Sequence, residues 1–319
     1  MNFKVVTRLA SATAIVALVI GGGFKLATNK ANEAAEHSVS QLVSLAETAS
    51  DGDLRLTYGD VNNDLFSGVT TVNDVTFKTA DGAPVFEVGA VRFSADGGAN
   101  GERLPHAVNL GLHGVVVVDP DALKNLNRNL SVDFRDSPFN VLVSYDYNGA
   151  GDVINPTLSV SGDGFADIDI AVTLSNVRSL WKALESSYAA NGMHLDFDQN
   201  EQQTLVKLVK NVRINEATVT YTNNGEFEAT IEREAAADGV TAEQMRLGIS
   251  EAVDSRVGRT TYVSEVQAFL MHPKNITVTV KPELPIDQKE LNNRAGLLMH
   301  YTQKALEGLD VTVKVNQQS

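Results

Sequence analysis

The amino-acid sequence predicts an α+β protein, with an N-terminal transmembrane helix, then an antiparallel β-meander, then mixed helices and strands. Three observations lead to this fold class. Near the N-terminus, Lys4 and Arg8 precede an uncharged apolar run from Leu9 to Phe24. From Asp53 to about Leu174, hydrophobic and polar residues alternate with a period of two, as in half-buried strands. After that point, hydrophobic residues recur at steps of three and four, as on one face of a helix.

The apolar run is expected to anchor the chain in a membrane. Counted from Val5 to Ala27, it suffices to cross the roughly 30 Å hydrocarbon core, with Lys4, Arg8 and Lys25 extending toward the lipid headgroups. A cleaved signal peptide is the alternative, but Lys25 interrupts the position at which its small-residue cleavage site belongs. The basic lead favours a cytoplasmic N-terminus. The residues expected to hold the anchor in the bilayer are Leu9, Ile15, Val16, Leu18, Val19, Ile20 and Phe24.

Composition excludes several classes of function. The 40 acidic and 26 basic residues give a net charge of −14, which argues against nucleic-acid binding and against electrostatic binding to anionic lipid headgroups. The chain has no cysteine. Disulfides, a thiolate nucleophile and a cysteine metal site are therefore excluded, which suits an oxidising compartment.

The chain is predicted to have four parts. A membrane anchor at 1–28 is followed by an amphipathic helix at 29–50, a β-rich domain at 51–175 and an α+β domain at 176–319. The apolar positions of the amphipathic helix are Ala31, Ala35, Val39, Leu42, Leu45 and Ala49. This helix is expected either to pack on the domain or to make a coiled-coil contact, since two heptads are too few to decide.

Alternating residues and turn sequences predict the strands of the β-rich domain. The strands begin with the alternation of Leu54, Leu56 and Tyr58, and continue at 69–78, 85–93, 108–118 and 139–147. The predicted turns are Asn62-Asn63-Asp64, Asp81-Gly82, Asp96-Gly97-Gly98, Asn148-Gly149 and Asp163-Gly164. Short strands joined in this way indicate an antiparallel sheet. Val115, Val116, Val117 and Val118 are apolar on both faces of one strand, so that strand is expected to be covered twice or to lie in a concave trough.

Helical stripes dominate the α+β domain. They comprise Val177, Leu180, Trp181, Leu184 and Tyr188; then Leu205, Leu208, Val209 and Val212; then Phe227, Ile231 and Ala235, closed by Gly239; and Val263, Val266 and Leu270. Thr241 to Gln244 has the form of a capping box and predicts the start of another helix. A last helix is predicted from Asp287 to Gly308, flanked by strands at 276–280 and 311–315.

Motifs for catalysis and metal binding are incomplete throughout the sequence. The six histidines include no HExxH and no pair at helical spacing. Asp60 to Asp64 begins like a calcium loop, but Leu65 replaces the required glycine. Ser179 to Lys182 matches S-x-x-K without the companion elements of that enzyme class. Asp167 and Asp169 would share one solvated strand face. No cofactor, metal or catalytic residue is therefore expected.

The N-terminal part of the chain resembles a known family. The anchor (AIVALVIGGGF), the amphipathic helix, Leu54-Arg55-Leu56-Thr57-Tyr58 and Asn63-Asp64-Leu65-Phe66-Ser67-Gly68 are similar to the YdgA-like proteins, over roughly residues 1–80. That family consists of envelope proteins anchored in the inner membrane of Gram-negative bacteria. The C-terminal segments 239–246 and 269–274 are similar to proteobacterial envelope proteins of unknown function. The resemblance implies a single-pass inner-membrane protein with most of the chain in the periplasm, and it implies no site residues.

Two classes of function follow. The first is a non-enzymatic envelope protein whose concave sheet binds lipid acyl chains or an envelope protein partner, with Val115, Val116, Val117 and Val118 as ligand contacts. AsmA-like lipid-transfer proteins have a similar order of anchor and sheet. The alternative is an envelope hydrolase that uses carboxylates. With so many acidic residues, pairs of carboxylates close in the sequence are expected by chance and are weak evidence for this class. An open apolar trough favours the first class, and a closed pocket with convergent carboxylates favours the second.

Overall fold

A computed structural model describes most of the chain after residue 53. The described residues are 54–64, 67–96, 104–120, 123, 137–163, 165–191, 199–257, 261–298 and 302–316. The predicted anchor at 1–28, the predicted amphipathic helix at 29–50 and the glycines of the predicted turn at 96–98 lie outside these residues. Within the described ranges, no helix is both long and apolar enough to cross a membrane.

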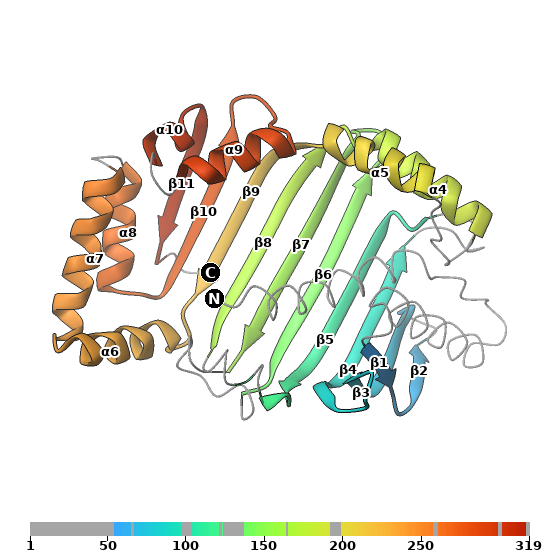
Figure 1. Ribbon diagram of the computed structural model, residues 1–319, viewed down its shortest axis with the longest axis horizontal. Helices are drawn as coiled ribbons and strands as arrows, with labels where there is room; N and C mark the ends of the chain where they lie inside the picture. Colours follow the sequence, from blue (N-terminus) through green and yellow to red (C-terminus); the bar gives the residue numbers. More distant parts are fainter. Residues whose placement is uncertain are drawn as a thin grey trace.

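The described strands form one antiparallel sheet of 11 strands (Figure 1). They are β1 (Leu54–Thr57), β2 (Val61–Asp64), β3 (Val69–Thr79), β4 (Pro84–Asp96), β5 (Ala107–Val117), β6 (Phe139–Asn148), β7 (Val153–Gly162), β8 (Phe165–Ser175), β9 (Arg213–Thr222), β10 (Asn275–Pro282) and β11 (Leu309–Val315). From β3 to β11 each strand pairs with the next one in the sequence, while β1 and β2 both pair with β3. The predicted mixture of helices with an antiparallel sheet is confirmed.

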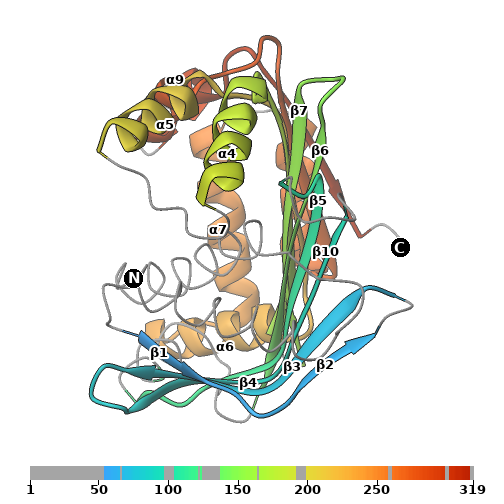
Figure 2. The same ribbon diagram turned by 90° about the vertical axis from the view of Figure 1, so that its right-hand side faces the viewer.

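Helices join the later strands and lie on one side of the sheet (Figure 2). They are α4 (Arg178–Asn191), α5 (Gln199–Asn211), α6 (Glu226–Asp238), α7 (Ala242–Val257), α8 (Thr261–Met271), α9 (Gln288–Leu298) and α10 (Thr302–Leu306). Figure 1 shows α4, α5 and α9 along one end of the strands, and α7 and α8 beside β11. Figure 2 shows that β3 and β4 curve toward the same side as the helices.

One face of the sheet is apolar across eight strands. Successive Cα partners from β4 to β11 form a single row: Phe93, Leu110, Val143, Leu158, Ile170, Val219, Val278 and Val313. Because side chains alternate between the two faces of a strand, the row two residues away lies on the same face. It is also apolar, and it consists of Val91, Leu112, Val141, Val160, Ile168, Tyr221, Ile276 and Val315. The apolar face is therefore continuous across the boundary at residue 175 between the two predicted domains.

The opposite face is polar and is held together by hydroxyl contacts. Thr218 and Thr279 have their hydroxyl oxygens 3.1 Å apart, and those of Thr220 and Thr277 are 3.0 Å apart. Such cross-strand Thr pairs each contribute roughly 0.2–1 kcal/mol relative to alanine pairs. The helices cover the apolar face, because burial of that face is favourable. The difference between the faces also fixes the register of the strands, because a slip of one residue would move apolar side chains to the hydroxyl-rich face.

Most strand predictions are confirmed, and two details differ. β3, β4, β5 and β6 coincide with the predicted strands to within a few residues, and the Asp81-Gly82 turn is present, with Gly82 at a φ of 89°. Asn62-Asn63-Asp64 is not a turn but part of β2, because pairing with β3 overrides the turn preference of these residues. The turn follows instead, with Gly68 at a φ of 66°. β9 was not predicted, although it joins the two halves of the sheet.

The predicted helices are confirmed apart from the last. The capping box is present: the Thr241 amide donates to Gln244 Oε1 at 2.9 Å, and the Gln244 amide donates to Thr241 Oγ1 at 3.1 Å. Gly239 ends α6 with a φ of 69°. The single helix predicted from Asp287 to Gly308 is two helices, α9 and α10, with residues 299–301 outside the described ranges.

Candidate functional site

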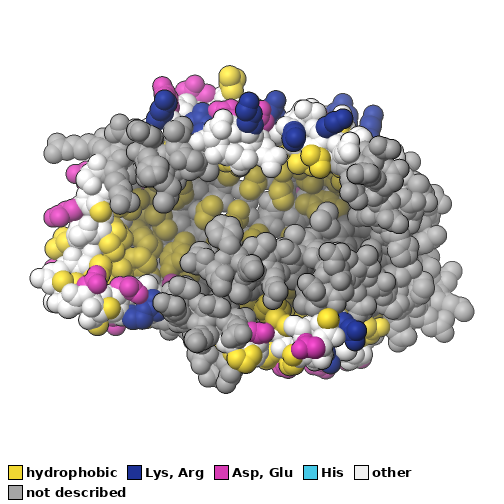
Figure 3. All heavy atoms as spheres, in the orientation of Figure 1, with side chains coloured by type: hydrophobic (Ala, Val, Ile, Leu, Met, Phe, Trp, Pro, Cys, Tyr) yellow, Lys and Arg dark blue, Asp and Glu magenta, His cyan; other side chains and the backbone are white. Residues whose placement is uncertain are grey.

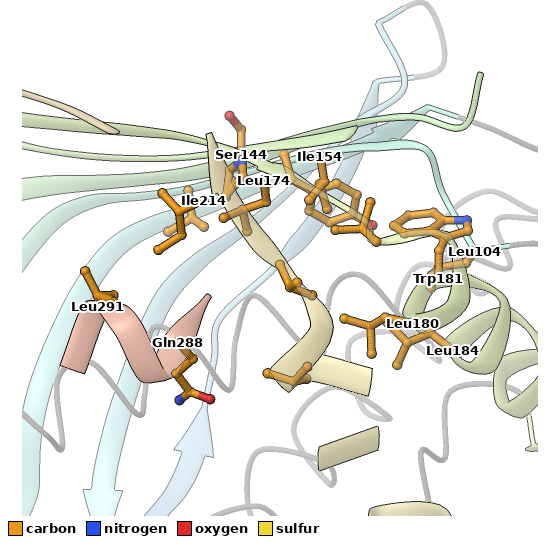
Figure 4. A pocket seen from close by; sticks show the side chains of 16 residues that line it. Leu104, Ser144, Ile154, Leu174, Leu180, Trp181, Leu184, Ile214, Gln288 and Leu291 are labelled. Carbon is orange, nitrogen blue, oxygen red and sulfur yellow. The ribbon is translucent and has the colours of Figure 1, made fainter. Parts of the chain in front are cut away.

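An apolar cavity lies between the apolar face of the sheet and helices α4, α5 and α9 (Figure 4). Its volume is about 520 Å³, which falls within the range typical of small-molecule sites. The lining residues are Leu104, Val143, Ser144, Tyr145, Ile154, Pro156, Leu174, Val177, Leu180, Trp181, Leu184, Val209, Val212, Ile214, Gln288 and Leu291. All of them except Ser144 and Gln288 present hydrophobic or aromatic side chains.

Strands β6 to β9 form the flat wall of the cavity. Val143 and Tyr145 are two residues apart on β6 and therefore share its inner face. Tyr145 is paired with Pro156 on β7, and Leu174 on β8 is paired with Ile214 on β9. Hydrophobic residues at alternate positions of these strands form this wall, and the hydroxyl-rich face lies on the other side of the same strands.

The opposite wall is helical. Val177, Leu180, Trp181 and Leu184 recur at three- and four-residue steps at and within the start of α4, so one stripe of that helix faces the sheet. Val209 is contributed by α5, and Leu291 by α9. The exposed fractions of Val209 and Leu291 are 43% and 42%, so these two side chains line the cavity and also reach the surface. They mark the side on which the cavity opens.

Aromatic rings close one end of the cavity. Trp181, the only tryptophan of the chain, is 5% exposed and stacks on Tyr147, with ring centroids 3.9 Å apart and planes 18° from parallel. Tyr145 meets Trp181 edge-on at 6.0 Å and donates its hydroxyl to the carbonyl oxygen of Pro105 at 3.0 Å. Burial raises the pKa of the Tyr147 phenol, and Asp152 adds to this effect. The imidazole of His106 packs edge-on against both rings of this stack, with ring centroids 5.5 Å from Tyr147 and 5.9 Å from Trp181.

Polar groups in the cavity wall are few and point elsewhere. The Ser144 hydroxyl lies 2.6 Å from Thr157 Oγ1, and Figure 4 shows it on the far side of its strand. Gln288 is exposed at the first position of α9. The lining residues include no aspartate, glutamate, histidine, lysine or arginine. The arrangement can hold an apolar group by the hydrophobic effect.

The four valines predicted from sequence lie elsewhere in the sheet. Val115 and Val117 on β5 are 3% and 0% exposed and belong to the core formed by β3, β4, β5 and β6. Val116 and Val118 are half-buried, so both faces of this segment are at least partly covered, as predicted. None of the four lines the cavity, and their role as ligand contacts stays a prediction.

The weaker catalytic candidates are not brought together. Ser179 and Lys182 are exposed on α4, while Trp181 between them is buried, as the helical stripe predicted. Asp169 is exposed, and its Oδ1 accepts a hydrogen bond from the Ser159 hydroxyl at 2.5 Å on the hydroxyl-rich face. Among the described residues, histidines and carboxylates nowhere form a group that could hold a metal ion.

Comparison with known proteins gives a family without an assigned activity. A family described as "Uncharacterized protein" matches residues 159–316, which extend from the end of β7 to the residue after β11. The matched region contains all the described helices and much of the cavity wall, including Leu174, Trp181 and Ile214. A search among curated proteins finds no match.

Proposed function

We propose that this protein binds an apolar chain, such as the acyl chain of a lipid, in the cavity between the sheet and helices α4, α5 and α9. The observation that carries the proposal is the lining of a cavity of about 520 Å³ by hydrophobic and aromatic side chains. Each methylene group moved from water into such a cavity contributes about 0.8 kcal/mol, so a chain of several methylenes binds without a polar anchor inside.

The setting that we propose is the bacterial envelope. The uncharged run from Leu9 to Phe24 would anchor the protein in the inner membrane as a single-pass helix, with the rest of the chain in the periplasm. The protein would act there by binding lipid, or a hydrophobic segment of another envelope protein, and not as an enzyme. The apolar run at residues 9–24 supports the location at a membrane, and the apolar cavity supports the binding of lipid.

Quenching of Trp181 by a brominated fatty acid tests the proposed ligand. Trp181 is the only tryptophan and lines the cavity, so a bromine atom carried into the cavity should quench its emission saturably. Full-length protein is titrated with bromostearate in the absence of vesicles. Absence of saturable quenching, together with absence of lipid from the purified protein, would overturn the proposal.

A matched pair of substitutions on α5 locates the binding. Val209 lines the cavity, whereas Val206, one turn away on the same helix, is 55% exposed and does not. Val209→Phe should fill part of the cavity and weaken bromostearate binding, while Val206→Phe should leave it unchanged. Because both positions are well exposed on one helix, folding should tolerate both changes equally. Equal effects of the two variants would exclude this cavity as the site.

A further inference from the structure

The mouth of the cavity lies at a surface whose composition differs from the rest of the molecule. We call this surface the α5–α9 rim, and it includes α5, α9 and the connection from β10 to α9. Figure 1 shows that connection projecting beyond the ends of the strands. The exposed large hydrophobic residues of the rim are Val206, Val209, Leu284 and Leu291. Its lysines outside ion pairs between described residues are Lys207, Lys210 and Lys289.

Exposed hydrophobic side chains at the rim continue into the cavity. Leu284 has an exposed fraction of 79%, the largest of any large hydrophobic residue in the described part of the chain. Val209 and Leu291 are exposed at the surface and also line the cavity. An apolar path therefore runs from the protein surface into the binding site. Apolar surface of this kind, bordered by polar residues, is typical of membrane or protein contact sites.

Charge distinguishes the rim from the acidic remainder of the protein. α5 carries Lys207 and Lys210 against Glu201. The connection from β10 to α9, together with α9, carries three carboxylates: Glu283 is exposed, Asp287 is paired with Arg213 at 2.7 Å, and Glu290 is paired with Arg294 at 2.7 Å. In contrast, α6 alone carries five carboxylates and a single arginine. Figure 3 shows lysine and arginine side chains, interspersed with aspartate and glutamate, along the edge at which α5 and α9 lie, next to hydrophobic side chains.

We infer that the α5–α9 rim docks on an anionic phospholipid surface, so that an acyl chain passes from the bilayer into the cavity without crossing water. This inference rests on the proposed function. The lysines of α5 meet the lipid phosphates, and Leu284, Val206 and Leu291 enter the boundary between headgroups and acyl chains. Amphipathic helices with lysines beside a hydrophobic stripe bind membrane interfaces in this way. The net charge of −14 opposes docking of other faces and so orients the molecule.

Single-cysteine labelling measures the docking directly, because the native chain has no cysteine. Full-length Leu284→Cys is labelled with the fluorophore NBD and reconstituted in vesicles of phosphatidylcholine and phosphatidylglycerol that contain a doxyl-labelled lipid quencher. The matched control is Val240→Cys, which is 41% exposed beside acidic α6. We expect a blue shift and strong quenching at position 284 and little of either at 240. Equal quenching at both positions would overturn the inference.

The electrostatic part of the inference is tested with the same label. Lys207→Glu and Lys210→Glu should each lower the ratio of docked to undocked protein at least about fivefold, since each basic residue near an anionic bilayer contributes about that factor. Vesicles of phosphatidylcholine alone should have a similar effect. An undiminished signal in these experiments would contradict docking through anionic lipid. Bromostearate quenching of Trp181 without vesicles separates the two proposals: if it persists while the label at 284 stays unquenched, the docking inference alone is wrong.

Discussion

Individual residues show how the closed end of the cavity is built. Trp181 is buried by Tyr147 and Tyr145 from the sheet and by Leu184 from its own helix. The hydrophobic stripe of α4 predicted this burial from the sequence. The sequence did not reveal the ring stacking, because Tyr147 and Trp181 are on elements separated by two strands. Trp181 Nε1 is buried and has no hydrogen-bond partner among the described residues, so packing holds the indole in place.

Removing the indole should therefore destabilise the protein strongly. Trp181→Ala is expected to lower the free energy of unfolding by about 3–5 kcal/mol, as for other large aromatic residues deleted from a core. The loss is measured from urea unfolding followed by circular dichroism, since the variant has no tryptophan. Trp181→Phe keeps a ring against Tyr147 and should lose much less. A loss below about 1 kcal/mol for alanine would show that the indole is not packed as described.

At the scale of elements, Asp287 links a helix terminus to a strand. Its Oδ1 accepts the Glu290 amide of α9 at 2.8 Å, and its Oδ2 pairs with Arg213 of β9 at 2.7 Å. The Glu290 amide is the largest cause of the lowered pKa of Asp287, and Arg213 adds to it. These contacts hold α9 against β9, and they sit beside Gln288 and Ile214 of the cavity wall.

Stability should depend on pH through this carboxylate. Because the pKa of Asp287 in the folded protein lies below its unfolded value of 3.8, the stabilisation is complete at neutral pH. It should be lost as the pH falls below 3.8 and through the lower folded value. Asp287→Asn keeps a capping side chain but removes the charge, so its urea midpoint should lie below that of the native protein at neutral pH and converge with it in acid. Arg213→Gln should show a smaller difference of the same sign. A difference that is constant with pH would contradict this account.

Prediction of elements from the sequence succeeded where a segment has a clear period and clear ends. Hydrophobic and polar residues alternate along most of β3 to β6, these strands are bounded by turn residues, and α6 ends at a glycine. β9 was missed because its sequence RINEATVTYT directly follows a helical stripe that ends at Val212, with no turn signal between them. Its threonines alternate with Ala217, Val219 and Tyr221, which is the signal that could have identified it.

At the scale of the whole molecule, the cavity was not predictable because its walls come from distant parts of the chain. Tyr145 and Leu291 lie on opposite walls but are separated by most of the second half of the sequence. Each stripe was recognised as buried, but no pattern in the sequence states which stripe faces which strand. The same limit applies to Val115 to Val118, whose two-sided hydrophobicity reflects burial within the β3–β6 core. Apolar patterns predict which residues are buried. The position of a cavity depends in addition on where the apolar surfaces of the sheet and the helices leave space between them.

The cellular location of the whole molecule is predicted from residues outside the described ranges, and it sets where any ligand is found. The run from Leu9 to Phe24 should hold full-length protein in the inner membrane, with Ser319 in the periplasm. Membrane fractionation should recover the protein with inner-membrane markers, resistant to salt and alkaline washes. An alkaline phosphatase reporter fused after Ser319 should be active, because that enzyme folds only outside the cytoplasm.

The double substitution Val16→Arg and Val19→Arg should abolish membrane insertion, since each arginine costs about 2.5–3.5 kcal/mol at the centre of a membrane helix. Full-length protein found in the cytosol, with an inactive reporter, would show that residues 9–24 do not anchor the chain. The protein would then have no direct access to membrane lipid.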